Sequence, residues 1–157
     1  MSERTTIQGI VKSVADGQTW YGPSVSDIVK DITPETARTR SVANTHSIWE
    51  IAAHMVAWQE YNLRVMNGGD SAFLDDAHDW PDVEGHTDTD WEASIEQLAA
   101  DSRLIAEKLD SWDDEKLRET VRGRDFPFKV LLHGIAQHNI YHSGQIALLK
   151  KATGPIA

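Results

Sequence analysis

The sequence contains no cysteine among its 157 residues. Disulfides, thiolate metal ligands and a cysteine nucleophile are therefore excluded, and any bound metal ion must be held by nitrogen and oxygen atoms. Basic residues are also scarce, because 15 Lys and Arg stand against 25 Asp and Glu and give a formal net charge of -10. Nucleic acids and anionic membranes both require a cationic protein surface, so we expect neither as a partner.

Long apolar runs are missing as well. No stretch approaches the roughly 18 consecutive apolar residues that a transmembrane helix needs. The first residues, MSERTTIQGIVKSV, lack the basic start, apolar centre and small-residue cleavage site of a secretion signal. We therefore expect a soluble, cytoplasmic protein whose length fits a single domain over residues 1–157.

What the chain does contain is a helical repeat of apolar residues, with intervals of three and four in four long stretches. Three of these stretches open with the capping-box spacing, a hydroxyl side chain followed three residues later by Glu or Gln. The pairs are Thr5 and Gln8, Ser47 and Glu50, and Thr89 and Glu92. The fourth stretch follows Pro127 and is expected to span residues 128–152, before the stop residues Gly154 and Pro155. A shorter amphipathic run follows Ser24, and the sequence leaves open whether it is a separate helix.

Residues 68–88 have no apolar period and are rich in Gly, Asp and Pro. So long a segment is either a functional lid or a crossover between distant helix ends. Its acidic residues do not have the spacing of a calcium loop and are expected to be solvated. They are Asp70, Asp75, Asp76, Asp79 and Asp82. Four principal helices with one long connection predict an all-α protein, a four-helix bundle with a long crossover loop.

Three histidines are the candidate metal ligands. His138 and His142 are four residues apart, which places them one turn apart on one face of a helix, and His54 lies in the middle of another predicted helix. Bundles build metal sites from inward side chains of facing helices. Three imidazoles could hold one divalent ion and leave coordination positions for water or substrate. The spacing alone is equally compatible with half-buried histidines that a carbonyl or carboxylate satisfies.

The remaining histidines and the neighbouring polar and aromatic residues have alternative interpretations. We interpret His46, His78, His86 and His133 as non-ligands. The aromatic residues that could line a pocket over the metal, or belong to an ordinary core, are Trp20, Tyr21, Trp58 and Tyr141. Glu50 is either a partner of His54, a general base, or only the capping-box carboxylate, and the cap is favoured. Gln145 either hydrogen-bonds a ligand histidine or bound water, or is a surface amide.

Two segments of the chain, SIWEIAAHMVAWQEY and HGIAQHNIYHSGQIALLK, resemble the two signature helices of the DinB-like (damage-inducible) superfamily. The ending H-x-x-x-H-x-G-Q, here His138, His142, Gly144 and Gln145, is the most specific part, and WYGPS and the helix around Trp91 are similar too. The resemblance implies an up-down-down-up bundle that binds a divalent ion, commonly nickel or zinc, through His54, His138 and His142. It also implies a homodimer.

The resemblance leaves the function open. Characterised branches are similar to thiol-dependent S-transferases and isomerases that use a low-molecular-weight thiol such as bacillithiol or mycothiol, with the metal activating the thiolate. The first hypothesis is therefore a metal-dependent enzyme acting on a small-molecule substrate. The alternatives are a non-catalytic metal-binding or stress-response protein and a metal-dependent hydrolase. An open coordination position beside a substrate-sized pocket favours an enzyme, and a closed, dry site favours the non-catalytic protein.

Overall fold

The computed structural model describes residues 2–153. The four long helices are α1 (Glu3–Asp16), α4 (Ile48–Met66), α6 (Asp88–Lys108) and α8 (Phe128–Thr153). Shorter elements are α2 (Val25–Val29), α3 (Pro34–Arg38), α5 (Asp76–Asp79), the 3-10 turn η1 (Leu109–Ser111) and α7 (Asp114–Arg118). Over residues 2–153 no strand forms, and Thr120 and Pro127 make only an isolated bridge. The all-α prediction is confirmed, while the predicted stop residues Gly154 and Pro155 lie outside the described residues.

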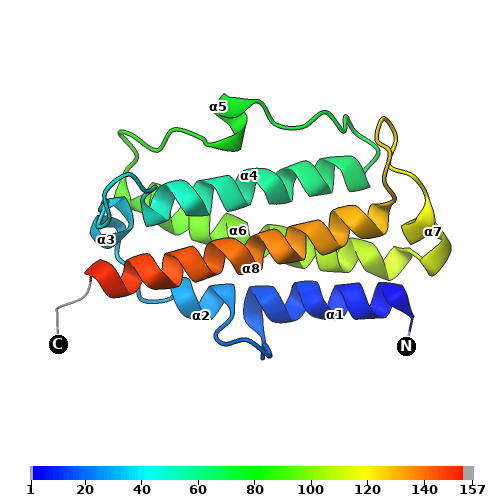
Figure 1. Cartoon of the computed structure of the whole chain (residues 1–157), viewed down its shortest axis with the longest axis horizontal. Helices are drawn as coiled ribbons and strands as arrows, with labels where there is room; N and C mark the ends of the chain where they lie inside the picture. Colours follow the sequence, from blue (N-terminus) through cyan, green and yellow to red (C-terminus); the bar gives the residue numbers. More distant parts are fainter. Residues whose placement is uncertain (1, 154–157) are drawn as a thin grey trace.

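The directions of the long helices can be followed by colour in Figure 1. α1 and α8 run from right to left, whereas α4 and α6 run from left to right. This arrangement is consistent with the up-down-down-up bundle. The amphipathic run after Ser24 is the separate helix α2, whose capping box joins Ser24 to Asp27. Within residues 2–153, no helix is both long and apolar enough to cross a bilayer.

The long connection between α4 and α6 is the crossover segment, residues 67–87. It leaves the C-terminal end of α4, returns along the outer side of that helix and carries the single turn α5 on its way (Figure 1). A connection of this kind is needed because α4 and α6 run in the same direction, so that the end of one lies a full helix length from the start of the other. The segment therefore passes directly over the middle of α4.

The helix starts follow the predicted capping chemistry at α4 and depart from it at α1 and α6. Ser47 and Glu50 form the predicted capping box of α4. The expected Thr5–Gln8 box is wrong, since Ser2 caps α1 and the Gln8 amide donates instead to the carbonyl of Ala106. The start expected at Thr89 lies two residues too late.

The N-terminus of α6 is capped by Thr87, and the shorter acid Asp90 completes its capping box. The amide of Thr87 donates to Asp90 Oδ2 at 2.7 Å, which satisfies one of the free N–H groups at the start of the helix. The core between the helices is built from fully buried side chains of each. Examples are Ile7, Trp49, Met55, Ile105, Leu132 and Ile146.

Candidate metal centre

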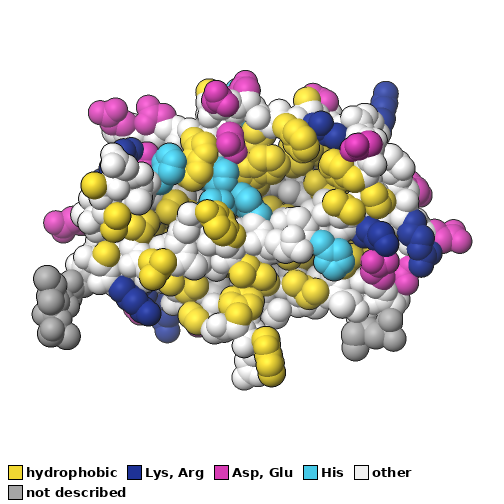
Figure 2. Space-filling view, viewed as in Figure 1, with side chains coloured by type: hydrophobic (Ala, Val, Ile, Leu, Met, Phe, Trp, Pro, Cys, Tyr) yellow, Lys and Arg dark blue, Asp and Glu magenta, His cyan; other side chains and the backbone are white. Residues whose placement is uncertain are grey.

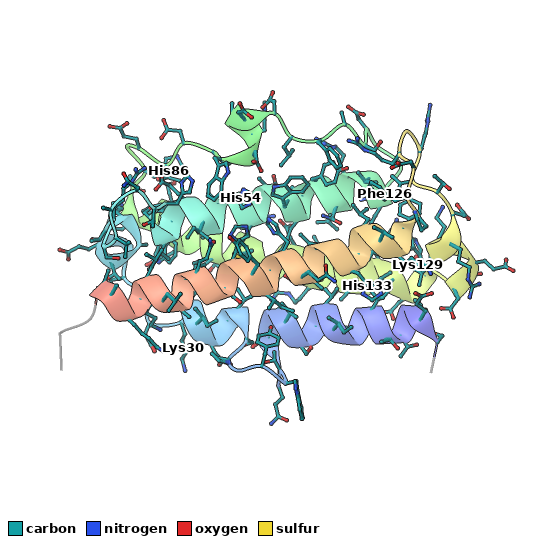
Figure 3. All side chains as sticks on the ribbon, viewed as in Figure 1. Lys30, His54, His86, Phe126, Lys129 and His133 are labelled. Atoms are coloured by element: carbon teal, nitrogen blue, oxygen red, sulfur yellow. The ribbon has the colours of Figure 1, made fainter. Side chains whose placement is uncertain are left out.

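The three predicted ligands lie together in the groove between α4 and α8. His54 comes from the middle of α4 (Figure 3), and His138 and His142 come from successive turns of α8. The Nε2 atom of His54 is 2.9 Å from Nε2 of His138 and 3.1 Å from Nε2 of His142. The side chains of His54 and His142 are buried, and all three offer ligand atoms within 4.8 Å of one another. Residues 84 and 88 positions apart in sequence thus form one cluster of imidazole nitrogens.

The outer nitrogens of two of these rings face oxygen acceptors. His54 Nδ1 donates to the main-chain carbonyl of Asp79 at 2.6 Å, and His142 Nδ1 donates to Oε1 of Gln145 at 2.7 Å. Carbonyl and amide oxygens only accept hydrogen bonds, so both Nδ1 atoms carry the proton. In the neutral ring this leaves the lone pair on Nε2, the atom that faces the cluster. The two rings are held in the tautomer that binds a metal.

These contacts bear on both interpretations of the histidines. The acceptors at Nδ1 satisfy one nitrogen of His54 and of His142, as expected for structural histidines, but their Nε2 atoms meet only other imidazoles. The buried Nδ1 atom of His138 has no hydrogen-bond partner. Lone pairs about 3 Å apart repel unless a cation lies between them, and two nitrogens bound to one ion at about 2.1 Å lie roughly 3.0 to 3.4 Å apart. The donor set therefore fits a divalent ion.

The protonation states of the cluster suit the same role. Burial, followed by the neighbouring His142 and His54, lowers the pKa of His138 from 6.5 to about 3. Burial also lowers the pKa of His142, although its hydrogen bond to Gln145 opposes the shift. His138 and His142 are therefore held in the neutral form, in which imidazole binds a metal ion.

The cluster forms part of the wall of an open pocket of about 710 Å³. Figure 2 shows a group of histidine side chains beside a hollow in the middle of this face, with hydrophobic side chains on both sides. Besides the three histidines, the lining residues are Val42, Asn44, Thr45, His46, Ile51, Trp58, Asp79, Trp80, Tyr141, Gln145, Leu148 and Leu149. The volume suits a small molecule, and the walls are mainly apolar.

The crossover segment contributes two residues that sequence reasoning did not place in the site. The ring of Trp80 is stacked between two imidazoles, with its centroid 4.0 Å from that of His54 and 3.7 Å from that of His46. Asp79 was expected to be solvated, but its Oδ1 accepts from the indole of Trp58 at 2.6 Å and lies 3.2 Å from His54 Nδ1. The sequence signal that could have placed these two residues in the site is a tryptophan next to an aspartate in an otherwise polar loop, because a buried indole usually needs a hydrogen-bond or packing partner.

The other predicted neighbours divide into those inside and those outside the pocket. Trp58, Tyr141 and Gln145 line the pocket. Gln145 hydrogen-bonds His142, as expected if it is a partner of a candidate ligand rather than a surface amide. Trp20 lies outside it and is completely exposed, with Tyr21 also exposed beside it, so neither residue lines the pocket or belongs to the core. The loop between α1 and α2 that carries them lies below the bundle, on the side away from the crossover segment (Figure 1).

Glu50 is the capping carboxylate and does not line the pocket. Partial burial acts to raise its pKa, but hydrogen bonds from Ser47 and the charge of Arg40 lower the pKa on balance. The histidines interpreted as non-ligands lie outside the cluster. His46 nevertheless lines the pocket, where it stacks on Trp80.

Comparison with family models identifies the superfamily of the chain. The model of the DinB superfamily matches residues 23–146, a range that includes α4, the crossover segment, α6 and all three histidines of the cluster. No curated protein and no solved structure matches the chain significantly.

Proposed function

Because the chain belongs to the DinB superfamily, we propose that it is a divalent-metal-dependent enzyme in which His54, His138 and His142 hold one ion, nickel or zinc. Both metals accept imidazole nitrogen, and the chain has no thiolate to offer. The observation that carries the proposal is the position of the three Nε2 atoms. They converge at the wall of an open pocket of about 710 Å³, so that a ligand in the pocket can reach them.

The ion would supply Lewis acidity, which lowers the pKa of a thiol or water so that the nucleophilic anion is available near pH 7. The residues of the chain would hold the histidine rings in place and orient the substrate. The Asp79 carbonyl and the Gln145 amide fix the rings of His54 and His142. Trp80 covers His54 from the side of the crossover segment and limits access of water to that ring. Tyr141, whose hydroxyl accepts from Gln145 Nε2 at 3.2 Å, is placed to hydrogen-bond a substrate at the pocket mouth.

We further propose a thiol-dependent S-transferase or isomerase reaction on a small, uncharged and largely apolar substrate. The chain has no cysteine, so an attacking thiol must come from outside. Among the described residues that line the pocket, Asp79 is the only acid, and Lys and Arg are absent. Apart from the proposed ion, neither a strongly anionic electrophile nor a thiol with several carboxylates would find a basic side chain of Lys or Arg there. A weakly charged low-molecular-weight thiol fits better.

Two alternatives use the same three histidines. In a metal-dependent hydrolase, the activated nucleophile would be water, and the reaction would need no thiol. In a non-catalytic metal-binding or stress-response protein, the ion would chiefly stabilise the bundle. The open pocket of about 710 Å³ favours an enzyme over this last alternative, because a purely structural ion is usually enclosed by four protein ligands.

Metal content tests the site directly. Purified protein should carry about one divalent ion per chain by elemental analysis, and His138→Ala should lose most of it because two imidazoles hold an ion far less tightly. The matched control is His133→Ala, a histidine on the same helix outside the cluster, which should keep the metal. Full occupancy in His138→Ala would refute the three-histidine site.

Activity tests the reaction. The metal-loaded protein should conjugate or isomerise an apolar electrophile in the presence of a low-molecular-weight thiol, while chelated protein and His142→Ala should show no turnover. Turnover that is metal-dependent but needs no thiol would favour the hydrolase. A metal-loaded protein inactive with every thiol and every ester or amide in the screen would favour the non-catalytic alternative.

A homodimer is also proposed, from the family resemblance and from apolar side chains exposed on α8. Leu148 is 69% exposed and Tyr141, two turns away on the same face, is 64% exposed. Light scattering should give twice the chain mass at micromolar concentration, and Leu148→Glu should lower it toward the monomer. Leu104→Glu, at an exposed leucine of α6, is the control. A monomer mass for the unmodified protein would contradict the proposal.

A further inference from the structure

A fourth histidine shares the pocket with the cluster. His46 lies just before Ser47, the N-cap of α4, and it lines the same pocket as the three clustered histidines without belonging to their cluster. Its side chain is 47% exposed, so the ring is open both to the pocket and to solvent water. The proposed metal site makes no use of this residue.

The flat face of the His46 ring is held by Trp80. The two rings are stacked with 3.7 Å between their centroids and 7° between their planes, and His54 is stacked on the same indole at 4.0 Å. The two imidazoles therefore lie on opposite faces of Trp80, separated by the thickness of one aromatic ring. Burial is the main cause that lowers the pKa of His142, and the charge of protonated His46 adds to this shift, so His46 lies within electrostatic reach of the cluster.

A fixed carboxylate determines which edge of the His46 ring faces the pocket. Nδ1 lies 3.7 Å from Oε1 of Glu50, which is too long for a hydrogen bond but close enough for an ion pair. The carboxylate is held in place, because Oε1 also accepts from Arg40 and Oε2 accepts from the amide of Ser47. Glu50 does not line the pocket, so the ring directs Nδ1 away from the pocket and presents Nε2 to it.

This arrangement suits the delivery of a proton into the pocket. Histidine is the side chain that most often acts as a general acid, since imidazole exchanges protons near neutral pH. The negative charge of Glu50 beside Nδ1 stabilises the imidazolium, in which Nε2 also carries a proton. Because the ring is half exposed, it can take up a new proton from water after each transfer.

We propose that His46 is the general acid of the reaction, and that the substrate is an apolar electrophile whose own oxygen must receive a proton, an α,β-unsaturated ketone in the simplest case. The inference rests on the proposed thiol transfer. The thiol releases its proton to solvent, its sulfur forms a bond to the β-carbon, and the carbon–carbon π bond breaks as its electrons move toward the carbonyl oxygen. His46 Nε2 gives that oxygen a proton, and the enol then becomes the saturated ketone in water. His46 recovers one proton from solvent, so no further reactant is needed.

Two electrophiles separate proton transfer from the rest of the reaction. With N-acetylcysteamine as the thiol, benzylideneacetone needs a proton on its oxygen, whereas benzyl chloride releases chloride, which leaves without one. His46→Phe keeps a ring that can stack on Trp80 but has no nitrogen. Its rate with benzylideneacetone should fall about 100-fold, the lower end of the range for general acid–base catalysis. Its rate with benzyl chloride should fall much less.

A binding measurement needs neither turnover nor metal. Chelated protein is titrated with phenylethanol, whose hydroxyl can hydrogen-bond either protonation state of an imidazole, and with ethylbenzene, which lacks the hydroxyl. Phenylethanol should bind His46→Phe about tenfold more weakly than it binds the unmodified protein, because one hydrogen bond corresponds to a factor of that order. Ethylbenzene should bind both proteins alike.

His78→Phe is the matched control. His78 is an exposed histidine of the crossover segment that does not line the pocket, so this variant should keep both rates and both affinities. Elemental analysis of His46→Phe should show the same metal content as the unmodified protein. Loss of the ion would mean that His46 acts by supporting Trp80 and His54, which would overturn its role as an acid.

The remaining outcomes are distinct. Equal affinity of phenylethanol for His46→Phe and the unmodified protein would overturn the position of Nε2 in the pocket. An equal loss of rate with the two electrophiles would overturn the proton transfer while leaving the proposed thiol transfer in place. Inactivity of the unmodified, metal-loaded protein with both electrophiles would refute the proposed function itself, and with it the role of His46.

Discussion

Two oxygen atoms outside the ligand set determine how the histidines present themselves. The carbonyl of Asp79 and the side-chain amide of Gln145 each accept the Nδ1 proton of one ring. If either acceptor were lost, the ring could adopt the other tautomer or rotate, and its Nε2 lone pair would no longer be fixed toward the cluster. Such contacts commonly change metal affinity 10- to 100-fold.

The first prediction concerns Gln145. Gln145→Leu keeps the size of the side chain but removes the acceptor from His142, so we expect metal affinity to fall by about tenfold or more. Competition with a chromophoric chelator would measure the change. Gln137→Leu, an exposed glutamine on the same helix, serves as the control and should bind as before. Unchanged affinity in Gln145→Leu would mean that packing alone orients His142.

A second prediction concerns Asp101, a carboxylate that is 1% exposed inside α6. Burial raises its pKa from 3.8 to about 6, with the hydrogen bond from Gln97 opposing the shift and the charge of Glu60 adding to it. The folded protein therefore holds a proton that the unfolded chain releases near pH 4. This contribution to stability is present at low pH and is lost as the pH rises through about 6.

Asp101→Asn should accordingly be more stable than the unmodified protein at pH 7.5, by about 1 to 2 kcal/mol, and should lose that advantage near pH 4. Urea unfolding at the two pH values would measure both quantities. Glu96→Gln removes an exposed carboxylate from the same helix and should change little. A variant that is less stable than the unmodified protein at pH 7.5 would show that the ionised carboxylate has a compensating partner.

At the scale of elements, the crossover segment is held to the bundle at the histidine cluster. Asp79 accepts from Trp58 and His54, and Trp80 is stacked between His46 and His54. Near its start, Tyr61 donates to the carbonyl of Ser71 at 3.0 Å. The segment thus acts as a strap over α4, and Asp79 and Trp80 anchor its middle at His54.

Trp80→Ala tests this anchoring. Each aromatic pair contributes about 0.5 to 1.5 kcal/mol, so loss of both stacks should raise the open population of the strap about tenfold. Limited proteolysis should then cut within residues 68–87 faster, and the bound ion should exchange faster with a chelator. His78→Ala changes an exposed side chain of the same turn, α5, and is the control. Equal cleavage rates in the two variants would mean that Asp79 alone holds the strap.

The secondary-structure elements also show which features of the structure could be predicted from the sequence. The apolar period predicted the long helices, and the spacing of four predicted that His138 and His142 share one helix face, because both signals are local to one helix. His54 became the third candidate through its place in another predicted helix and through the family resemblance. The position of the strap could not be predicted, because Asp79 and Trp80 acquire their roles only by packing on α4. Asp79 and His54, for example, are 25 residues apart in the sequence. Trp20 was misplaced for the converse reason, since its type suggests burial but its loop leaves the bundle.

For the whole molecule, the cluster is a junction between α4 and α8. His54 lies on one helix and His138 and His142 on the other, so a bound ion would join the two across the groove. Without an ion, protonation of His138 or His142 would destabilise the fold, because burial lowers the pKa of both. An imidazolium in this position would be partly buried and close to two other rings.

The last prediction follows from the pKa of His138, which burial lowers from 6.5 to about 3. As the pH falls below 6.5, the unfolded chain binds a proton at this residue that the folded protein refuses, so stability declines progressively until about pH 3. At pH 5 the expected loss is at most roughly 2 kcal/mol. Urea unfolding of chelated protein at pH 5 and pH 7.5 should reveal it, and His138→Leu should flatten the dependence, whereas His133→Leu should not. If His138→Leu kept the full pH dependence, the acid sensitivity would have to arise at other groups, and the neutral state of the cluster would have a different origin from the burial described here.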